Sequence, residues 1–127
     1  MPTQFLFLAG LNGFLVVAIG AFGAHALQAR LLANSTVDTF QTGVHYHMFH
    51  TLALLAVALL AMHNPDSRLL SAAGYLLLGG IVLFSGSLYT LSLTGISWLG
   101  AITPLGGLGF LAAWGCLMVH AFNRMSS

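Results

Sequence analysis

Histidines are the residues of this sequence that could carry chemistry in an otherwise apolar chain. His45, His47 and His50 lie close together, and His25 precedes them. His47 and His50 are three residues apart and share one face of a helix, whereas His45 points to another face. A neutral imidazole ligates zinc, copper or iron, and two histidines from facing helices can hold a haem. One hypothesis is therefore a metal or haem site of His25 and His50, with His47 as a further ligand.

Hydroxyl groups near these histidines could add hydrogen bonds to a ligand. Tyr46 lies four residues before His50 and shares its helix face. The candidate ligand-binding set is His25, Tyr46, His50, Ser85, Tyr89 and Thr103. The alternative is a structural role, because histidines near helix ends often tie helices together, and serine and threonine hydroxyls often bond to carbonyls of their own helix. The residue types leave both interpretations open.

The composition shows what kind of fold must position these side chains. Of the 127 residues, 4% are charged and 58% are apolar, whereas soluble domains have roughly 25% charged residues. The formally charged side chains are Arg30, Asp38, Asp66, Arg68 and Arg124. So few charges would not keep a soluble bundle of this size dispersed. The composition therefore predicts an integral membrane protein, with the lipid bilayer as its first partner.

The charged residues leave three long uncharged stretches, 1–29, 39–65 and 69–123. A spanning helix needs about 20 apolar residues, so the first two stretches hold one helix each and the third holds two. We expect helices at about 4–27, 36–62, 69–93 and 99–122 within a single membrane domain, 1–127. Residues 28–35 are expected to form a loop, and Ser35 is the expected N-terminal cap of the second helix.

Short connections favour an all-α, integral membrane four-helix up-down bundle. This topology brings the histidine-bearing ends of the first two helices beside the serine- and tyrosine-bearing end of the third, at one leaflet. Arg68 and Arg124 lie at one end of such a bundle and Arg30 at the other. Because positive charges favour the cytoplasm, both termini are expected there.

Several function classes have no support in the sequence. A net charge of +1 offers no basic surface for nucleic acid. With two acidic residues, both in expected loops, carboxylate catalysis is not expected. We find no nucleophile paired with a base and an orienting acid, so we predict no catalytic residues.

Four motifs, in order along nearly the whole chain, carry a family resemblance. They are GAFGAHAL at 20–27, TGVHYHMFH at 42–50, LFSGSLY at 83–89 and TPLGG at 103–107, followed by Trp114. Together they resemble the YgdD-like family, small four-helix inner-membrane proteins of bacteria whose function is unknown. The resemblance implies a bacterial inner-membrane location and no particular activity. The family pattern more often has glutamine at the position of His47, which favours His25 and His50 as ligands.

We therefore expect a small, non-enzymatic accessory or structural subunit, alone, as a homo-oligomer or in a larger membrane complex. The alternative is a binding protein for haem, a metal, a quinone or a lipid that uses the polar cluster; the sequence requires none of these cofactors. A small transporter is a third hypothesis, but membrane-embedded acids and internal repeats are missing from the sequence.

Overall fold

Four long helices dominate the molecule. The computed structural model describes residues 2–126, and all regular secondary structure in that range is helical. Four helices are long and apolar enough to cross a membrane, at Thr3–Ala24, Val37–His63, Arg68–Thr94 and Ser97–Met125. Each has 22 to 29 residues, and about 20 suffice to cross the hydrocarbon core. The chain is thus an all-α integral membrane bundle, which confirms the predicted fold class.

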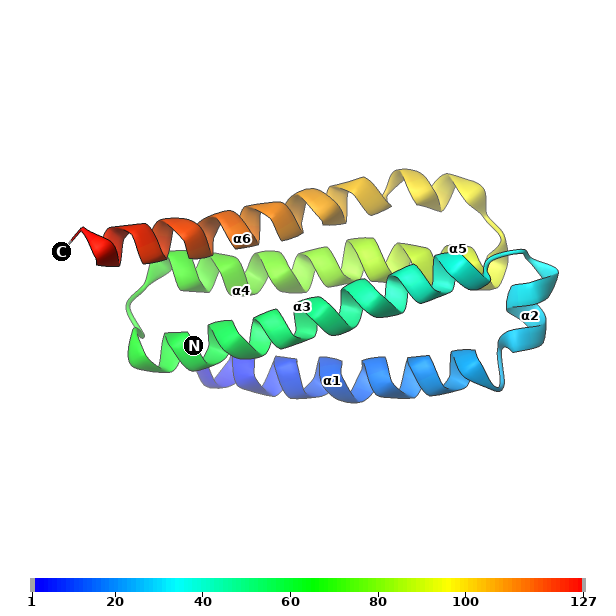
Figure 1. The fold of residues 1–127 in the computed structure, drawn as a ribbon, viewed down its shortest axis with the longest axis horizontal. Coiled ribbons are helices and arrows are strands. Elements are labelled where there is room, and N and C mark those ends of the chain that lie inside the picture. Colours follow the sequence, from blue (N-terminus) through cyan, green and yellow to red (C-terminus); the bar gives the residue numbers. More distant parts are fainter. Residues whose placement is uncertain (1, 127) are drawn as a thin grey trace.

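The elements alternate in direction along the chain (Figure 1). In order they are α1 (Pro2–Ala24), α2 (Gln28–Ala33), α3 (Val37–His63), α4 (Arg68–Gly80), the π-helix η1 (Ile81–Ser85), α5 (Gly86–Thr94), the 3₁₀-helix η2 (Ser97–Ala101) and α6 (Thr103–Met125). Figure 1 shows both chain ends at one end of the bundle and the short helix α2 at the other. We call these the terminal end and the α2 end.

The first connection differs from the expected loop. Helix α1 ends at Ala24, three residues before the predicted end, because the amides of His25 and Leu27 both bond to the carbonyl of Phe22 and close the last turn. Residues 28–33 then form α2 instead of a loop. Ser35 is not the cap of α3: it has a left-handed φ of 54°, and Thr36 is the residue before the helix.

The segment from α2 to α3 caps the end of α5. Helix ends leave carbonyls without partners, and these must be bonded where water is scarce. Asn34 donates to the carbonyls of Ser92 and Leu93, at 3.1 and 3.3 Å. Thr36 Oγ1 donates to Ser92 O at 2.8 Å, and Arg30 Nη1 donates to Leu93 O at 3.2 Å. These bonds anchor the α2 end of the bundle.

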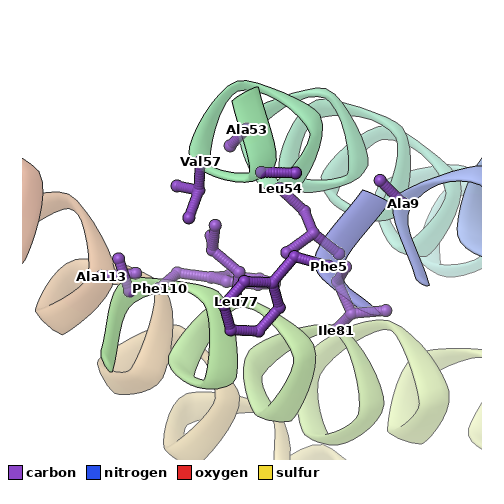
Figure 2. Packing of buried hydrophobic residues seen from close by; sticks show 11 residues of the cluster. Phe5, Ala9, Ala53, Leu54, Val57, Leu77, Ile81, Phe110 and Ala113 are labelled. Atoms are coloured by element: carbon purple, nitrogen blue, oxygen red, sulfur yellow. The ribbon is translucent and has the colours of Figure 1, made fainter. Parts of the chain in front are cut away.

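The second span, α3, is the centre of the lateral arrangement. α3 packs against α1 on one side and against α4, η1 and α5 on the other, and α6 packs against α4 and η1. Residues of all four spans meet in the buried apolar cluster of Figure 2, which includes Phe5, Leu54, Leu77 and Phe110. Small residues in this cluster, such as Ala73 and Ala113, are fully buried and allow helices to approach closely.

A π-helical turn interrupts the third span at η1. The amide of Gly86 bonds to the carbonyl of Ile81, five residues earlier, so one extra residue fits into this turn. α6 packs directly on it, because a Cβ on Gly106 would overlap the backbone of Phe84. π-turns occur often at functional sites, and this one lies beside the polar residues described next.

Candidate functional site

A buried polar chain links three helices in the half of the bundle nearer α2. His47 of α3 is 3% exposed and uses both ring nitrogens. Its Nε2 lies 2.9 Å from Asn12 Oδ1 on α1, and its Nδ1 lies 2.8 Å from the hydroxyl of Tyr89 on α5. His47 therefore connects the first span to the third through its ring.

The partners of His47 determine where its proton lies. Asn12 Nδ2 donates to the carbonyl of Leu8 at 2.9 Å, so its Oδ1 is the atom that faces His47. An amide oxygen only accepts, so His47 Nε2 carries the hydrogen, and Nδ1 accepts from the hydroxyl of Tyr89. The Tyr89 proton is shared between His47 Nδ1 and the carbonyl of Gly43. Because a buried charge without a counter-charge is costly, the ring is the neutral Nε2–H tautomer.

Gly43 supplies a second contact between α3 and the third span. Its carbonyl accepts from Ser85 Oγ at 2.8 Å and lies 3.3 Å from the Tyr89 hydroxyl. A Cβ at Gly43 would come within 3.0 Å of the Tyr89 ring, so glycine allows this approach. Ser85 is fully buried. Ser85 and Tyr89 therefore act here as ties between helices.

Thr103 forms a similar tie at the start of α6. Its hydroxyl lies 2.6 Å from that of Ser87, which also bonds to the carbonyl of Phe84 at 2.9 Å. This pair fixes α6 to the third span next to the π-turn.

His50 is held on both ring nitrogens, in the opposite way to His47. Its Nδ1 lies 2.8 Å from the carbonyl of Tyr46, which only accepts, and its Nε2 lies 3.2 Å from the indole N–H of Trp114, which only donates. His50 is therefore the Nδ1–H tautomer. Its ring stacks on Phe110 with the centroids 3.5 Å apart and the planes 5° from parallel. Neither nitrogen has a lone pair free for a metal.

The structure does not bring His25 to the other histidines. His25 lies exposed in the turn after α1. α1 and α3 are in register so that Gly23 meets Phe40 and Gly13 meets Thr51. His25 is therefore level with the start of α3, and from Phe40 to His50 the helical rise amounts to about 15 Å.

The proposed metal set of His25, His47 and His50 is thus not assembled. Among residues 2–126, no group of three or more His, Cys, Asp or Glu side chains is placed to hold a metal ion. The polar residue of α1 that bonds to His47 is Asn12, which is not among the residues selected from the sequence. A lone asparagine in an apolar span was the available signal, because such a residue almost always faces a partner.

A groove opens between α3 and α6 toward the surrounding bilayer. It has a volume of about 860 Å³. Its lining consists of His45, Tyr46, Phe49, His50, Phe84, Pro104, Gly107, Leu108, Phe110, Leu111 and Trp114. We call this the lateral groove. Of the candidate ligand-binding residues, it brings together Tyr46 and His50 only; its aromatic wall of Phe84, Phe110 and Trp114 was not foreseen as a site.

Comparisons with known proteins agree with the fold. Residues 19–107 match a family model described as "Protein of unknown function (DUF423)". The chain is 48% identical over 121 residues to the UPF0382 membrane protein YwdK of Bacillus subtilis, covering 95% of this chain and 98% of that protein. It is 42% identical over 126 residues to a UPF0382 membrane protein of Haemophilus influenzae, covering 99% of both chains. No solved structure matches the chain.

A third relative carries the name of the family that the motifs resembled. The UPF0382 inner membrane protein YgdD of Escherichia coli K12 is 41% identical over 124 residues, which cover 97% of this chain and 93% of that protein. Fold and sequence thus define a small multi-pass membrane protein. The chain belongs to the DUF423 family of UPF0382 membrane proteins, which confirms the resemblance. The names of these relatives state no ligand, substrate or partner.

Proposed function

We propose that the protein binds a hydrophobic molecule of the bilayer in the lateral groove. The observation that carries this proposal is the groove itself, about 860 Å³ of open space at the level of His50. Ligand sites in proteins usually have volumes of about 300–1,000 Å³ and mostly apolar walls. Arg, Lys, Asp and Glu are missing from the lining residues, so an apolar molecule suits it better than an ion or a nucleotide.

The groove has a rigid wall, which favours binding. Trp114 and the carbonyl of Tyr46 fix the ring of His50, and Phe110 stacks on it. On the other side, the ring centroids of Tyr46 and Phe84 are 4.3 Å apart. Side chains held in this way lose little freedom when a ligand arrives, and this lowers the cost of binding. Binding alone needs no catalytic group, in keeping with the expected non-enzymatic role.

Filling the groove tests the proposal. Gly107 lines the groove, and a Cβ there meets only the Phe84 ring, at the ordinary contact distance of 3.9 Å. Gly107→Leu should therefore fold and occupy the groove. Gly115→Leu is the matched control on α6, because a Cβ there meets nothing within 4 Å and Gly115 is not a lining residue. Both variants and the original protein are purified in mild detergent, and their bound small molecules are extracted and measured by mass spectrometry.

We expect the original protein and the Gly115→Leu control to retain a hydrophobic molecule in stoichiometric amount. Gly107→Leu should lose it. Equal retention in both variants would overturn the proposal. A second copy of the chain is the competing occupant of the groove. If Gly107→Leu instead dissociates a dimer and no small molecule is found, the groove is a subunit interface and the proposal fails.

We also propose a bacterial inner-membrane location with both termini in the cytoplasm. Arg68 is the first residue of α4 and Arg124 lies in the last turn of α6, so both are at the terminal end, whereas Arg30 lies at the α2 end. Two positive charges against one support this orientation. A C-terminal fusion to alkaline phosphatase should be inactive and a fusion to green fluorescent protein should fluoresce. An active phosphatase would reverse the orientation without affecting the groove.

A further inference from the structure

We infer that the occupant of the lateral groove has a flat, oxygen-bearing ring as its head and a long apolar tail, the chemistry of a membrane quinone. This inference rests on the proposed function and specifies its ligand. Three features of the groove support it: the depth of its polar groups, their lack of partners and the orientation of its rings.

Depth comes first. α3 runs from Val37 to His63, so His50 is its middle residue. Tyr46 and His45 are four and five residues from this midpoint, which places their backbones about 6 and 7.5 Å from it along the helix. The hydrocarbon core extends about 15 Å to each side of the bilayer centre. Both side chains therefore leave the helix inside the hydrocarbon region.

Partners come second. The other polar side chains of α3 near this depth are bonded: His47 to Asn12 and Tyr89, and Thr51 to the carbonyl of His47 at 2.7 Å. By contrast, the hydroxyl of Tyr46 and the imidazole of His45 make no hydrogen bond to any residue in the range 2–126. Tyr46 is 44% exposed. A polar group without a partner in hydrocarbon is costly, so both groups call for a ligand atom that accepts or donates.

Ring orientation comes third. The planes of Tyr46 and His50 differ by 14°, those of Tyr46 and Phe110 by 20°, and those of His50 and Phe110 by 5°. Three rings of the groove thus lie nearly parallel. His50 and Phe110 are buried and Tyr46 is the exposed ring of the three. A flat ring can pack against Tyr46 in the same orientation, because offset parallel rings attract one another.

These features argue against a phospholipid as the specific ligand. A phosphate head group stays at the membrane surface, whereas Tyr46 and His45 offer hydrogen bonds well inside. An acyl chain could fill the groove but has no atom to bond to them. A ring with carbonyl oxygens meets both requirements, with its tail following the apolar side chains of Leu108 and Leu111.

Tryptophan fluorescence tests the inference, because quinones quench it at close range. The chain has two tryptophans: Trp114 lines the groove and Trp98, 66% exposed in η2, does not. Trp98→Phe leaves Trp114 as the reporter, and Trp114→Phe leaves Trp98 to measure quenching by quinone dissolved in the bilayer. Both proteins are placed in phosphatidylcholine nanodiscs and titrated with decylubiquinone.

We expect saturable quenching of Trp114 and only linear quenching of Trp98. In the Trp98→Phe background, Tyr46→Phe removes the hydroxyl but keeps the ring, and should weaken decylubiquinone binding about two- to tenfold, the usual value of one hydrogen bond. Tyr75→Phe is the matched control, because Tyr75 is also exposed but lies on α4 outside the groove. Decylbenzene has the tail but no oxygens, so it should compete with decylubiquinone equally well in Tyr46→Phe and in Tyr75→Phe.

The outcomes separate this inference from the proposed function. One combination is linear quenching of both tryptophans while mass spectrometry still finds a molecule that Gly107→Leu removes. This combination would overturn the inference of a ring-headed ligand and leave the proposed groove binding intact. Equal affinities for Tyr46→Phe and Tyr75→Phe would also overturn the inference. Equal retention of small molecules by Gly107→Leu and Gly115→Leu removes the proposed function and the inference together.

Discussion

The indole N–H of Trp114 donates to Nε2 of His50 at 3.2 Å and so joins α6 to α3 along the wall of the groove. Because this nitrogen accepts, the proton of His50 lies on Nδ1, and Nδ1–H donates a hydrogen bond to the carbonyl of Tyr46. His47, three residues away, has its proton on Nε2. Two neighbouring histidines of one helix thus have opposite tautomers, each determined by a different neighbouring helix.

Opposite tautomers can be observed directly. In protein labelled with ¹⁵N-histidine, the signals that His50→Asn removes should belong to an imidazole protonated on Nδ1, and those that His47→Gln removes to one protonated on Nε2, because each ring has one partner that only accepts. The other four of the six histidines should keep their signals in both variants. If both rings have the Nε2 proton, the bond from Trp114 to His50 does not exist.

His47→Gln should preserve the fold better than His47→Leu. A glutamine amide can donate to Asn12 Oδ1 and accept from Tyr89, as the ring does. Leucine leaves both groups buried without partners, at a cost of about 1–3 kcal/mol. Thermal unfolding in detergent measures the difference. His45→Leu is the control, because His45 is exposed and on another face; a loss as large as that of His47→Leu would contradict the bridging role.

Gly106→Ala should destabilise the bundle where Gly107→Ala does not. A Cβ at position 106 overlaps backbone atoms of Phe84, whereas one at position 107 stays 3.9 Å from the ring. Overpacking of this kind costs about 1–3 kcal/mol. Unfolding midpoints of the two variants, measured in the same detergent, provide the comparison. Similar midpoints would show that α6 is not seated on the π-turn as described.

Asn34→Ala should loosen the α2 end of the bundle. The side chain bonds to two terminal carbonyls of α5, Ser92 O and Leu93 O, and the net loss of such bonds is about 1 kcal/mol. Hydrogen exchange of the amides at 92–96 should increase more than that at 53–58 in the apolar core. Gln41→Ala, at an exposed position of α3, should change neither region. Uniform exchange across the chain would mean that Asn34 caps nothing.

The sequence predicted the four spans and their alternation because both depend on hydropathy and loop length. It did not predict which residues lie level with one another, because that depends on the packing of glycines against side chains. Gly23 on Phe40 and Gly13 on Thr51 leave His25 well away from His50, and the α1 residue that bonds to His47 is Asn12. The structure therefore separates His25 from the other residues of the predicted binding cluster.

The π-turn was beyond sequence reasoning for a similar reason. The stretch from Ile81 to Ser85 has an ordinary apolar composition, and its extra residue is accommodated by the close approach of Gly106 on a helix that follows later. Trp114 was noted as part of a family motif, but its bond to His50 depends on how α6 is turned around its axis. Hydropathy does not determine that rotation.

The protons placed on His47 and His50 leave each ring without formal charge, and the charged side chains Arg30, Asp38, Asp66, Arg68 and Arg124 belong to the ends of the spans. A membrane potential acts on a charge that moves through it, with about 2.3 kcal/mol per elementary charge for each 100 mV. The centre of this bundle offers the field no such charge. Energising the cell membrane should therefore leave the occupancy of the groove unchanged unless the occupant itself is an ion.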